Sequence, residues 1–253
     1  MPKHIIAVLN QKGGVGKTTT SINLSAYLAK NGHSVLLVDS DPQGNSTSGL
    51  GLDKQTLKST LYDVLFSRSD TSSTTVKINS KLSLLPSNAN LAGAEVELVG
   101  LPARELKLRD ALAGFDQDFV LIDCPPSLGL LTINALAAAN SVLIPVQAEY
   151  YALEGLSQLL SVIQQVRQSL NPGLDILGVL ITLFDSRNSL SAQVKTELEN
   201  YFGAKLFNTI VPRNVRLAEA PSFGRTIAEH DKWSKGARAY KALAKEVEKR
   251  TLG

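Results

Sequence analysis

Cysteine is almost absent from this sequence, because Cys124 is the one thiol among 253 residues. A single thiol excludes an intramolecular disulfide framework and is compatible with a reducing compartment. It also argues against an iron–sulfur cluster held by this chain, since such clusters need several thiolates. Cys124 follows an apolar run and is predicted to be a small buried residue, with a reactive thiol as the alternative.

Long apolar runs are absent as well. The run that follows Lys3 and His4 is too short for a signal peptide. The best candidate for a membrane span, residues 128–146, is interrupted by polar side chains such as Asn134 and Asn140. These absences predict a soluble, cytoplasmic protein with no membrane partner.

A strong net charge is also missing, but the charge is unevenly distributed. The chain has 26 Lys and Arg against 23 Asp and Glu, a net charge of +3. Residues 182–253 hold 13 basic and 8 acidic residues, a net of +5, whereas the remaining residues hold 13 and 15, a net of −2. A basic C-terminal third favours a polyanionic partner. Charge alone leaves open the alternative that these side chains form only a solvated face.

What the sequence does contain is an alternation of apolar, strand-like runs with helical patterns. It predicts an α/β fold, with a mainly parallel twisted sheet and helices on both faces, in a single domain of residues 1–253. The expected strands are 5–9, 35–38, 82–85, 119–122, 142–146, 177–183 and 206–211. The expected helices are 18–30, 130–139, 153–169, 190–202 and 232–249. Residues 67–80, rich in Ser, Thr and Asp, are predicted to be an exposed connection.

A glycine-rich segment, residues 10–19, lies between the first expected strand and the first expected helix. Its sequence is Asn-Gln-Lys-Gly-Gly-Val-Gly-Lys-Thr-Thr. In this setting a Gly-Lys-Thr loop binds phosphates through backbone N–H groups, and the following helix adds a positive field. Lys17 is expected to reach the β- and γ-phosphates, and the Thr18 hydroxyl to bind Mg²⁺. The nucleotide-binding residues are predicted to be Lys12, Gly13, Gly14, Val15, Gly16, Lys17, Thr18 and Thr19.

Three carboxylates are predicted to converge on that loop. Asp39 and Asp41 follow one expected strand, and Asp123 follows another. In open parallel sheets, ligands bind at the carboxyl edge, where these strands end. Asp39 and Asp123 are therefore candidate Mg²⁺ partners through water, and the expected ligand is a nucleotide.

Several segments taken in order resemble one family. Residues 12–19 resemble the deviant Walker A loop of the ParA/MinD ATPases, with Lys12 as the signature lysine. Residues 39–45 and 123–127 resemble the two later nucleotide motifs, and residues 212–222 resemble the chromosomal ParA, or Soj, branch. The resemblance runs almost end to end and is weakest at residues 68–81 and from His230 onward. It implies a P-loop NTPase fold and the ATPase reaction, with Mg²⁺ as cofactor.

The resemblance also implies roles for individual residues. By its position alone, Lys12 could fold onto its own nucleotide or reach one on a neighbouring subunit. The resemblance implies that Lys12 crosses a dimer interface to the partner's ATP, and that Asp41 orients the attacking water. Lys12, Lys17 and Asp41 are thus the predicted catalytic residues. Pro212 and Asn214 would line the adenine site, for which a loop without a ligand is the alternative.

DNA binding is implied in the same way. In chromosomal ParA relatives, the arginines that match Arg187 and Arg216 contact double-stranded DNA without sequence specificity. The resemblance therefore implies that this protein is nucleoid-associated. The ATP-bound form would be a homodimer, and a ParB/Spo0J-like centromere-binding protein would stimulate its hydrolysis. One departure from the family is residues 231–238, where Trp233 could stack on a partner or a base but is predicted to pack at a helix start.

Two other functions remain as alternatives. A MinD-like membrane-cycling ATPase would need a C-terminal helix with bulky apolar residues opposite lysines. The tail, residues 240–253, instead reads as a helix packed on its own domain. A metabolic P-loop enzyme that phosphorylates or ligates a small molecule is the second alternative, although no second substrate site is apparent.

Overall fold

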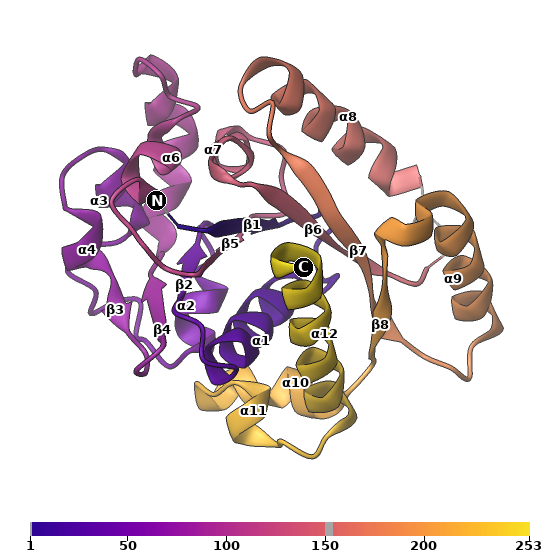
Figure 1. Cartoon of the computed structure of the whole chain (residues 1–253). Helices are drawn as coiled ribbons and strands as arrows, with labels where there is room; N and C mark the ends of the chain where they lie inside the picture. Colours follow the sequence, from indigo (N-terminus) through magenta and orange to yellow (C-terminus); the bar gives the residue numbers. More distant parts are fainter. Residues whose placement is uncertain (1, 150–153) are drawn as a thin grey trace.

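An eight-stranded sheet crosses the structure, a computed structural model that describes residues 2–149 and 154–253 (Figure 1). Its strand order is β3-β4-β2-β5-β1-β6-β7-β8. All neighbouring strands are parallel except β3 and β4, which are antiparallel. The strands are β1 (His4–Val8), β2 (Val35–Asp39), β3 (Val76–Lys77), β4 (Leu82–Leu85), β5 (Phe119–Asp123), β6 (Ser141–Gln147), β7 (Asp175–Phe184) and β8 (Leu206–Pro212).

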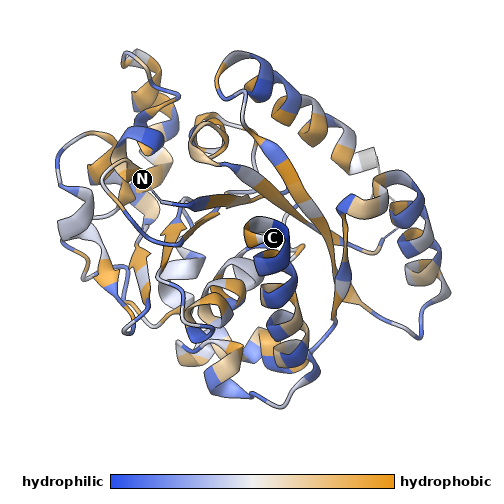
Figure 2. Ribbon diagram, in the orientation of Figure 1, coloured by the Kyte–Doolittle hydropathy of each residue, from blue (hydrophilic) through white to orange (hydrophobic). Residues whose placement is uncertain are grey.

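Every apolar run that was expected to be a strand is one. The central strands are buried on both faces: every residue of β2 and β5 is buried, which explains their continuous Val, Leu and Ile sequences. These strands appear as the hydrophobic ribbons at the centre of Figure 2. The predicted mainly parallel sheet is therefore confirmed.

Helices cover both faces of the sheet, as predicted. One face packs against α1 and α12 together with the short helices α10 and α11; the other packs against α3, α6, α7, α8 and α9 (Figure 1). The longer helices are α1 (Lys17–Lys30), α7 (Leu130–Ala138), α8 (Glu154–Ser169), α9 (Ser189–Phe202) and α12 (Lys235–Leu252). The shorter ones are α2 (Asn45–Gly49), α3 (Leu61–Leu65), α4 (Thr71–Thr74), α5 (Ala94–Glu97), α6 (Lys107–Leu112), α10 (Val215–Glu219) and α11 (Ile227–His230). Leu153, the expected first residue of α8, lies outside the described residues.

The C-terminal helix is packed on the body of the protein, as the sequence predicted. Tyr240, Leu243 and Val247 are buried along one face of α12, and the Tyr240 hydroxyl is 3.0 Å from Thr20 Oγ1 in α1. The apolar face of α12 is thus occupied by its own chain. No helix among the described residues combines the length and apolar character that crossing a bilayer requires.

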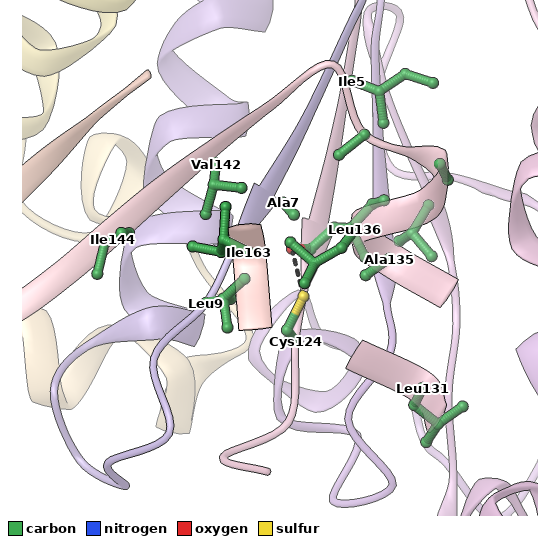
Figure 3. Close-up of a cluster of buried hydrophobic side chains, with 14 of the residues drawn as sticks. Ile5, Ala7, Leu9, Cys124, Leu131, Ala135, Leu136, Val142, Ile144 and Ile163 are labelled. Carbon is green, nitrogen blue, oxygen red and sulfur yellow. Dashed lines mark hydrogen bonds between the residues drawn. The ribbon is translucent and has the colours of Figure 1, made fainter. Parts of the chain in front are cut away.

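Cys124 lies inside the core, among Leu9, Leu131, Ala135 and other apolar side chains (Figure 3). Its Sγ is 3.7 Å from the carbonyl oxygen of Ile122. Burial raises the pKa of this thiol, so it remains protonated. The prediction of a small buried residue is confirmed.

The expectation of an exposed connection at residues 67–80 was only partly right. This segment contains α4 and the edge strand β3. Thr71 and Thr74 are buried, and Asp70 begins α4 by accepting hydrogen bonds from the N–H groups of Ser72 and Ser73. A polar N-terminal cap and an antiparallel pairing with β4 organise the segment, although it has no apolar periodicity.

Candidate functional site

The glycine-rich loop joins β1 to α1 at the centre of the sheet. Gly14 and Gly16 have φ values of 74° and 85°, a left-handed conformation that side chains disfavour. Thr182 in β7 donates from Oγ1 to the carbonyl of Val15 at 2.7 Å. Asn10, which is buried, donates to the Pro145 carbonyl and accepts the N–H of Lys12. The loop is therefore anchored to two neighbouring strands.

The loop's two lysines have opposite environments. Lys17 is 7% exposed, and its Nζ donates to the Lys12 carbonyl at 3.0 Å. Burial lowers its pKa, against the nearby charges of Asp123 and Asp41. The Lys12 side chain is 55% exposed and pairs with the half-exposed Glu149. One lysine thus faces into the loop and the other extends over its rim.

The predicted carboxylates do converge. Asp39 and Asp123 end the adjacent strands β2 and β5 and are direct neighbours in the sheet. Both are fully buried, and the Asp41 N–H lies 3.3 Å from Asp39 Oδ1. Val8, just before the loop, is the neighbour of Asp123 on the other side. The strand order β2-β5-β1 therefore brings the three carboxylates to the phosphate loop.

Hydroxyl groups hold these buried carboxylates. Ser21 and Ser46 donate to the two oxygens of Asp123 at 3.1 and 2.8 Å. Thr47 donates to Asp39 from both its N–H and its Oγ1, at 2.8 and 2.7 Å. Burial raises the pKa of Asp39, and the charge of Asp123 raises it further; burial likewise raises the pKa of Asp123. Two buried acids side by side are suited to accept a cation between them and the loop.

Asp41 is 7% exposed and has a fixed orientation. Its Oδ1 accepts the N–H of Gln43 at 2.9 Å, and its carbonyl accepts the Ser87 hydroxyl at 2.9 Å. The carboxylate therefore cannot turn freely at the mouth of the loop.

An open cavity of about 780 Å³ adjoins the Lys12 side of the loop. It is lined by Gln11, Lys12, Pro126, Ser127, Leu128, Gly155 and Gln158. Gln11 spans part of it by donating to the Gly155 carbonyl at 2.8 Å. Of the loop residues, only Gln11 and Lys12 line this cavity, which therefore lies beside the phosphate loop.

Pro212 and Asn214 lie at the end of β8. Pro212 is paired with Phe184 of β7, and Asn214 precedes α10. The Asn214 Oδ1 is buried and has no hydrogen-bond partner within the described part of the chain. A buried amide oxygen without a partner suits an exocyclic amine donor from a ligand.

Arg187 lies in the loop that follows β7, and Arg216 lies in α10, which follows the neighbouring strand β8; the Arg213 N–H donates to the Phe184 carbonyl between these two segments. Arg187 is 88% exposed and makes a two-pronged ion pair with Asp185. Arg216 is about half exposed and pairs with Glu219 at 2.8 Å. Neither arginine belongs to the carboxylate cluster, so the two predicted sites are separate.

The strand that carries Arg187 is irregular near its end. Leu183 has a φ of 51°, and the β7–β8 register shifts between Ile181 and Phe184. A left-handed leucine is strained, and bulges of this kind re-aim the backbone beside functional sites. The irregularity directly follows Thr182, which holds the phosphate loop.

Trp233 does not pack at the start of α12, so that prediction was wrong. Its side chain is 78% exposed. Gly236 and Ala237 are the buried residues of the first turn, and a Cβ on Gly236 would lie 2.6 Å from Leu217. Gly236 therefore makes the close contact between α12 and α10, and Trp233 stays exposed to solvent.

Sequence reasoning missed the residues that position the site. Asn10, Thr182 and Glu149 hold the loop, and Thr47 and Ser46 hold the carboxylates. The Ser-Thr-Ser stretch at residues 46–48 was a usable signal, since small hydroxyl residues after two acids can donate to them. Thr182 and Glu149 are distant in sequence and gave no such signal.

Known proteins resemble this chain over nearly its full length. A family model described as an AAA domain matches residues 3–176. The sporulation initiation inhibitor protein Soj of Bacillus subtilis is 55% identical over 249 residues, which cover 96% of this chain and 97% of the relative. The chromosome-partitioning ATPase Soj of Thermus thermophilus is 54% identical over 242 residues, covering 96% and 94%.

Among solved structures, the cobyrinic acid a,c-diamide synthase of Mycobacterium smegmatis with bound ADP and magnesium superimposes with a TM-score of 0.85. It is 40% identical, and the match covers 97% of this chain and 93% of that one. The fold thus has a counterpart in a structure that was solved with bound ADP and magnesium.

Proposed function

The chain belongs to the Soj/ParA family of chromosome-partitioning ATPases, and we propose that residues 1–253 form a single ATPase domain acting as a DNA-partitioning switch. With ATP and Mg²⁺ it forms a homodimer that binds nucleoid DNA without sequence specificity. A ParB/Spo0J-like centromere-binding protein stimulates hydrolysis, and the DNA is then released. The single observation that carries this proposal is the opposite exposure of Lys17 and Lys12 in one loop.

The residues present fit a nucleotide. The N–H groups of Gly13 to Thr19 surround the phosphates, and Lys17 exchanges the Lys12 carbonyl for phosphate oxygens. At the other end of the ligand, Asn214 would satisfy its buried Oδ1 by accepting from the adenine amine, beside Pro212. The similar synthase was solved with bound ADP and magnesium, which supports nucleotide binding by this chain.

They also fit Mg²⁺. No group of three or more His, Cys, Asp and Glu side chains among the described residues could enclose a metal ion. Mg²⁺ does not need such a cage, because it keeps several waters and takes few protein ligands beside the phosphates. Thr18 would bind it directly, and Asp39 and Asp123 would do so through water. When bound, Mg²⁺ neutralises charge on the β- and γ-phosphates.

In this proposal Asp41 orients the attacking water. Phosphoryl transfer depends mainly on positioning and electrostatics, and the Gln43 N–H holds the Asp41 carboxylate in one orientation. Its near-complete burial excludes competing bulk water from that carboxylate.

Lys12 supplies the second positive charge, across the dimer interface. Its present partner Glu149 is about half exposed, and exposed ion pairs contribute only about 0–1 kcal/mol. Exchanging this carboxylate for a phosphate of the partner's ATP therefore has little electrostatic cost. Such a lysine acts much as an arginine finger does.

The two alternatives fit less well. A MinD-like membrane cycle would need the apolar face of α12, which is buried against α1 and β8. A metabolic ligase function is suggested by the synthase, but at 40% identity that likeness is weaker than the 55% to Soj. ATPase stimulation by duplex DNA and a partner peptide, rather than by a metabolite, would distinguish the partitioning ATPase from a metabolic enzyme.

The test combines sizing with DNA retardation, each with ATP, with ADP and without nucleotide. Wild type is expected to be dimeric and to retard duplex DNA only with ATP. Lys12→Ala keeps some ATP binding but stays monomeric, and Arg216→Glu dimerises without retarding DNA. Lys30→Ala, an exposed lysine at the end of α1, is the matched control and should behave as wild type. A dimeric Lys12→Ala variant would remove the cross-subunit role, and a wild type that ignores DNA would remove the switch.

A further inference from the structure

We propose that Trp233 belongs to the surface that contacts duplex DNA, where its indole packs against the deoxyribose of a strand whose phosphates pair with Arg216 and Lys232. This inference rests on the proposed ATP-dependent DNA binding and assigns to it a residue that the resemblance to the family does not supply.

The exposure of Trp233 calls for a partner. It is the one tryptophan of the chain, and 78% of its side chain is accessible. A large aromatic ring is costly to leave in water, and exposed aromatics with basic neighbours favour interaction sites. The Lys232 ammonium lies 5.2 Å from the ring centroid, so a positive charge and a flat apolar face occur together.

A single carboxylate, that of Asp231, links the main chain of Trp233 to the side chain of Arg216. Asp231 Oδ1 accepts the N–H of Trp233 at 3.1 Å, and Asp231 Oδ2 is 3.7 Å from the Arg216 Nε. The close approach of Gly236 to Leu217 fixes the start of α12 against α10, the helix that bears Arg216. The exposed Trp233 and the exposed Arg216 therefore lie on two segments that are joined at Asp231.

Arg216 is also linked to a second exposed aromatic residue. Glu219, which pairs with Arg216, is 3.5 Å from the His230 Nε2, and the His230 ring stacks on Phe223 at 5.1 Å. Phe223 is 64% exposed. A second exposed aromatic, Phe223, is thus linked to Arg216 through His230 and Glu219.

Duplex DNA matches this combination better than an apolar protein surface does. Lys232, Lys235 and Arg238 are exposed within five residues of Trp233, and the first turn of α12 has no acidic residue. Phosphates suit these charges, and the apolar face of a sugar suits the indole. Such a contact reads no base, as expected for binding to any sequence.

The first experiment uses tryptophan fluorescence, because the chain's single indole makes the signal report Trp233 alone. Acrylamide should quench it strongly in the free protein with ATP and Mg²⁺. Saturating duplex DNA should lower the quenching constant by about half or more, for AT-rich and GC-rich duplexes alike. An unchanged constant while retardation shows DNA bound would overturn the inference and leave the proposed function intact.

The second experiment measures DNA affinity with ATP for Trp233→Ala, with Tyr201→Ala as the control. Tyr201, at the end of α9, is a 65% exposed aromatic outside this cluster. Trp233→Ala is expected to bind about fivefold to tenfold more weakly, in line with the loss of one aromatic contact to nucleic acid. Its salt dependence stays that of wild type because no charge is removed, whereas Lys232→Ala lowers the slope by about one.

Equal affinities of Trp233→Ala and wild type would overturn the inference, as would protection of the indole by a centromere-binding partner but not by DNA. Because the side chain is exposed, Trp233→Ala should keep the wild-type unfolding midpoint, and Trp233→Phe should recover most of the affinity. If wild type itself fails to retard DNA with ATP, the proposed function fails first, and that result is recognised before any variant is made.

Discussion

At the ends of β2 and β5 the charged side chains are buried and hydrogen-bonded from several sides, whereas beyond β7 and β8 they are exposed and paired with a close neighbour. Asp39 and Asp123 have no accessible surface, but the Arg187 side chain is 88% exposed. Both regions lie at the carboxyl edge of one sheet. The contrast indicates that the first region is built for fixed geometry and the second for exchange of partners, because exposed ion pairs are weak and easily replaced.

Asp41→Ala tests the buried region and should have the largest effect. We expect ATP hydrolysis to fall by about 100-fold or more, since a positioned carboxylate contributes about that much or more. ATP binding and ATP-dependent dimerisation should persist, so the variant remains dimeric. Steady-state ATPase assays and sizing measure the two effects. Asp53→Ala, which removes an exposed carboxylate, is the control, and wild-type turnover in Asp41→Ala would mean that another group positions the water.

Thr47→Val tests the hydrogen-bond shell of the buried region. The substitution keeps the volume but removes the hydroxyl that donates to Asp39 and accepts the Ser87 N–H. The free energy of unfolding should fall by about 2 kcal/mol, because a buried charged acceptor and a buried donor both lose a partner. Urea denaturation measures it. Thr56→Val, which loses a hydrogen bond in an exposed turn, should change it by less than about 0.5 kcal/mol.

Glu149→Gln tests the contribution of an exposed ion pair at the rim of the loop. The Lys12–Glu149 pair has side chains 55% and 47% exposed, so its loss should change the free energy of unfolding by less than about 0.5 kcal/mol. The same denaturation assay applies. A loss as large as that of Thr47→Val would show that the rim of the loop is as tightly held as the carboxylate cluster.

The smallest effect concerns the Arg187–Asp185 pair. A hydrogen bond from the Arg187 guanidinium lowers the pKa of Asp185 to about 2. The pair's contribution is therefore complete above the ordinary carboxyl pKa, and it is lost as the pH falls through about 2. In Arg187→Ala, the pKa of Asp185 should rise toward about 3.9. Carboxyl chemical shifts in an NMR titration measure it, and Lys195→Ala should leave it unchanged.

The sequence predicted most of the sheet because its strands are buried on both faces and so leave continuous apolar runs. It did not predict β3. It also did not predict the short helices between β2 and β5, because each of these helices has only four to six residues and depends on tertiary packing and caps. The phosphate loop and its carboxylates follow from residue type and from the ends of strands. Their convergence depends on the order β2-β5-β1, which comes from contacts distant in sequence.

The exposed region was harder to predict. Trp233 was expected to pack because aromatic residues often do, but the small residues Gly236 and Ala237 make the contact with Leu217 instead. The acidic partners of Arg187 and Arg216 are close in sequence, yet only the folded chain shows that Asp231 links Arg216 to Trp233. Local composition does not indicate which exposed charges will share a carboxylate.

The left-handed Leu183 in β7 gives the two regions a short covalent connection. Thr182, on its N-terminal side, is bonded to the phosphate loop, and Arg187 follows a few residues later. A leucine in this conformation costs about 1–3 kcal/mol, so the neighbours on both sides must hold it in place. The hydrogen bond that anchors the Val15 carbonyl therefore also fixes the backbone from which the segment bearing Arg187 departs.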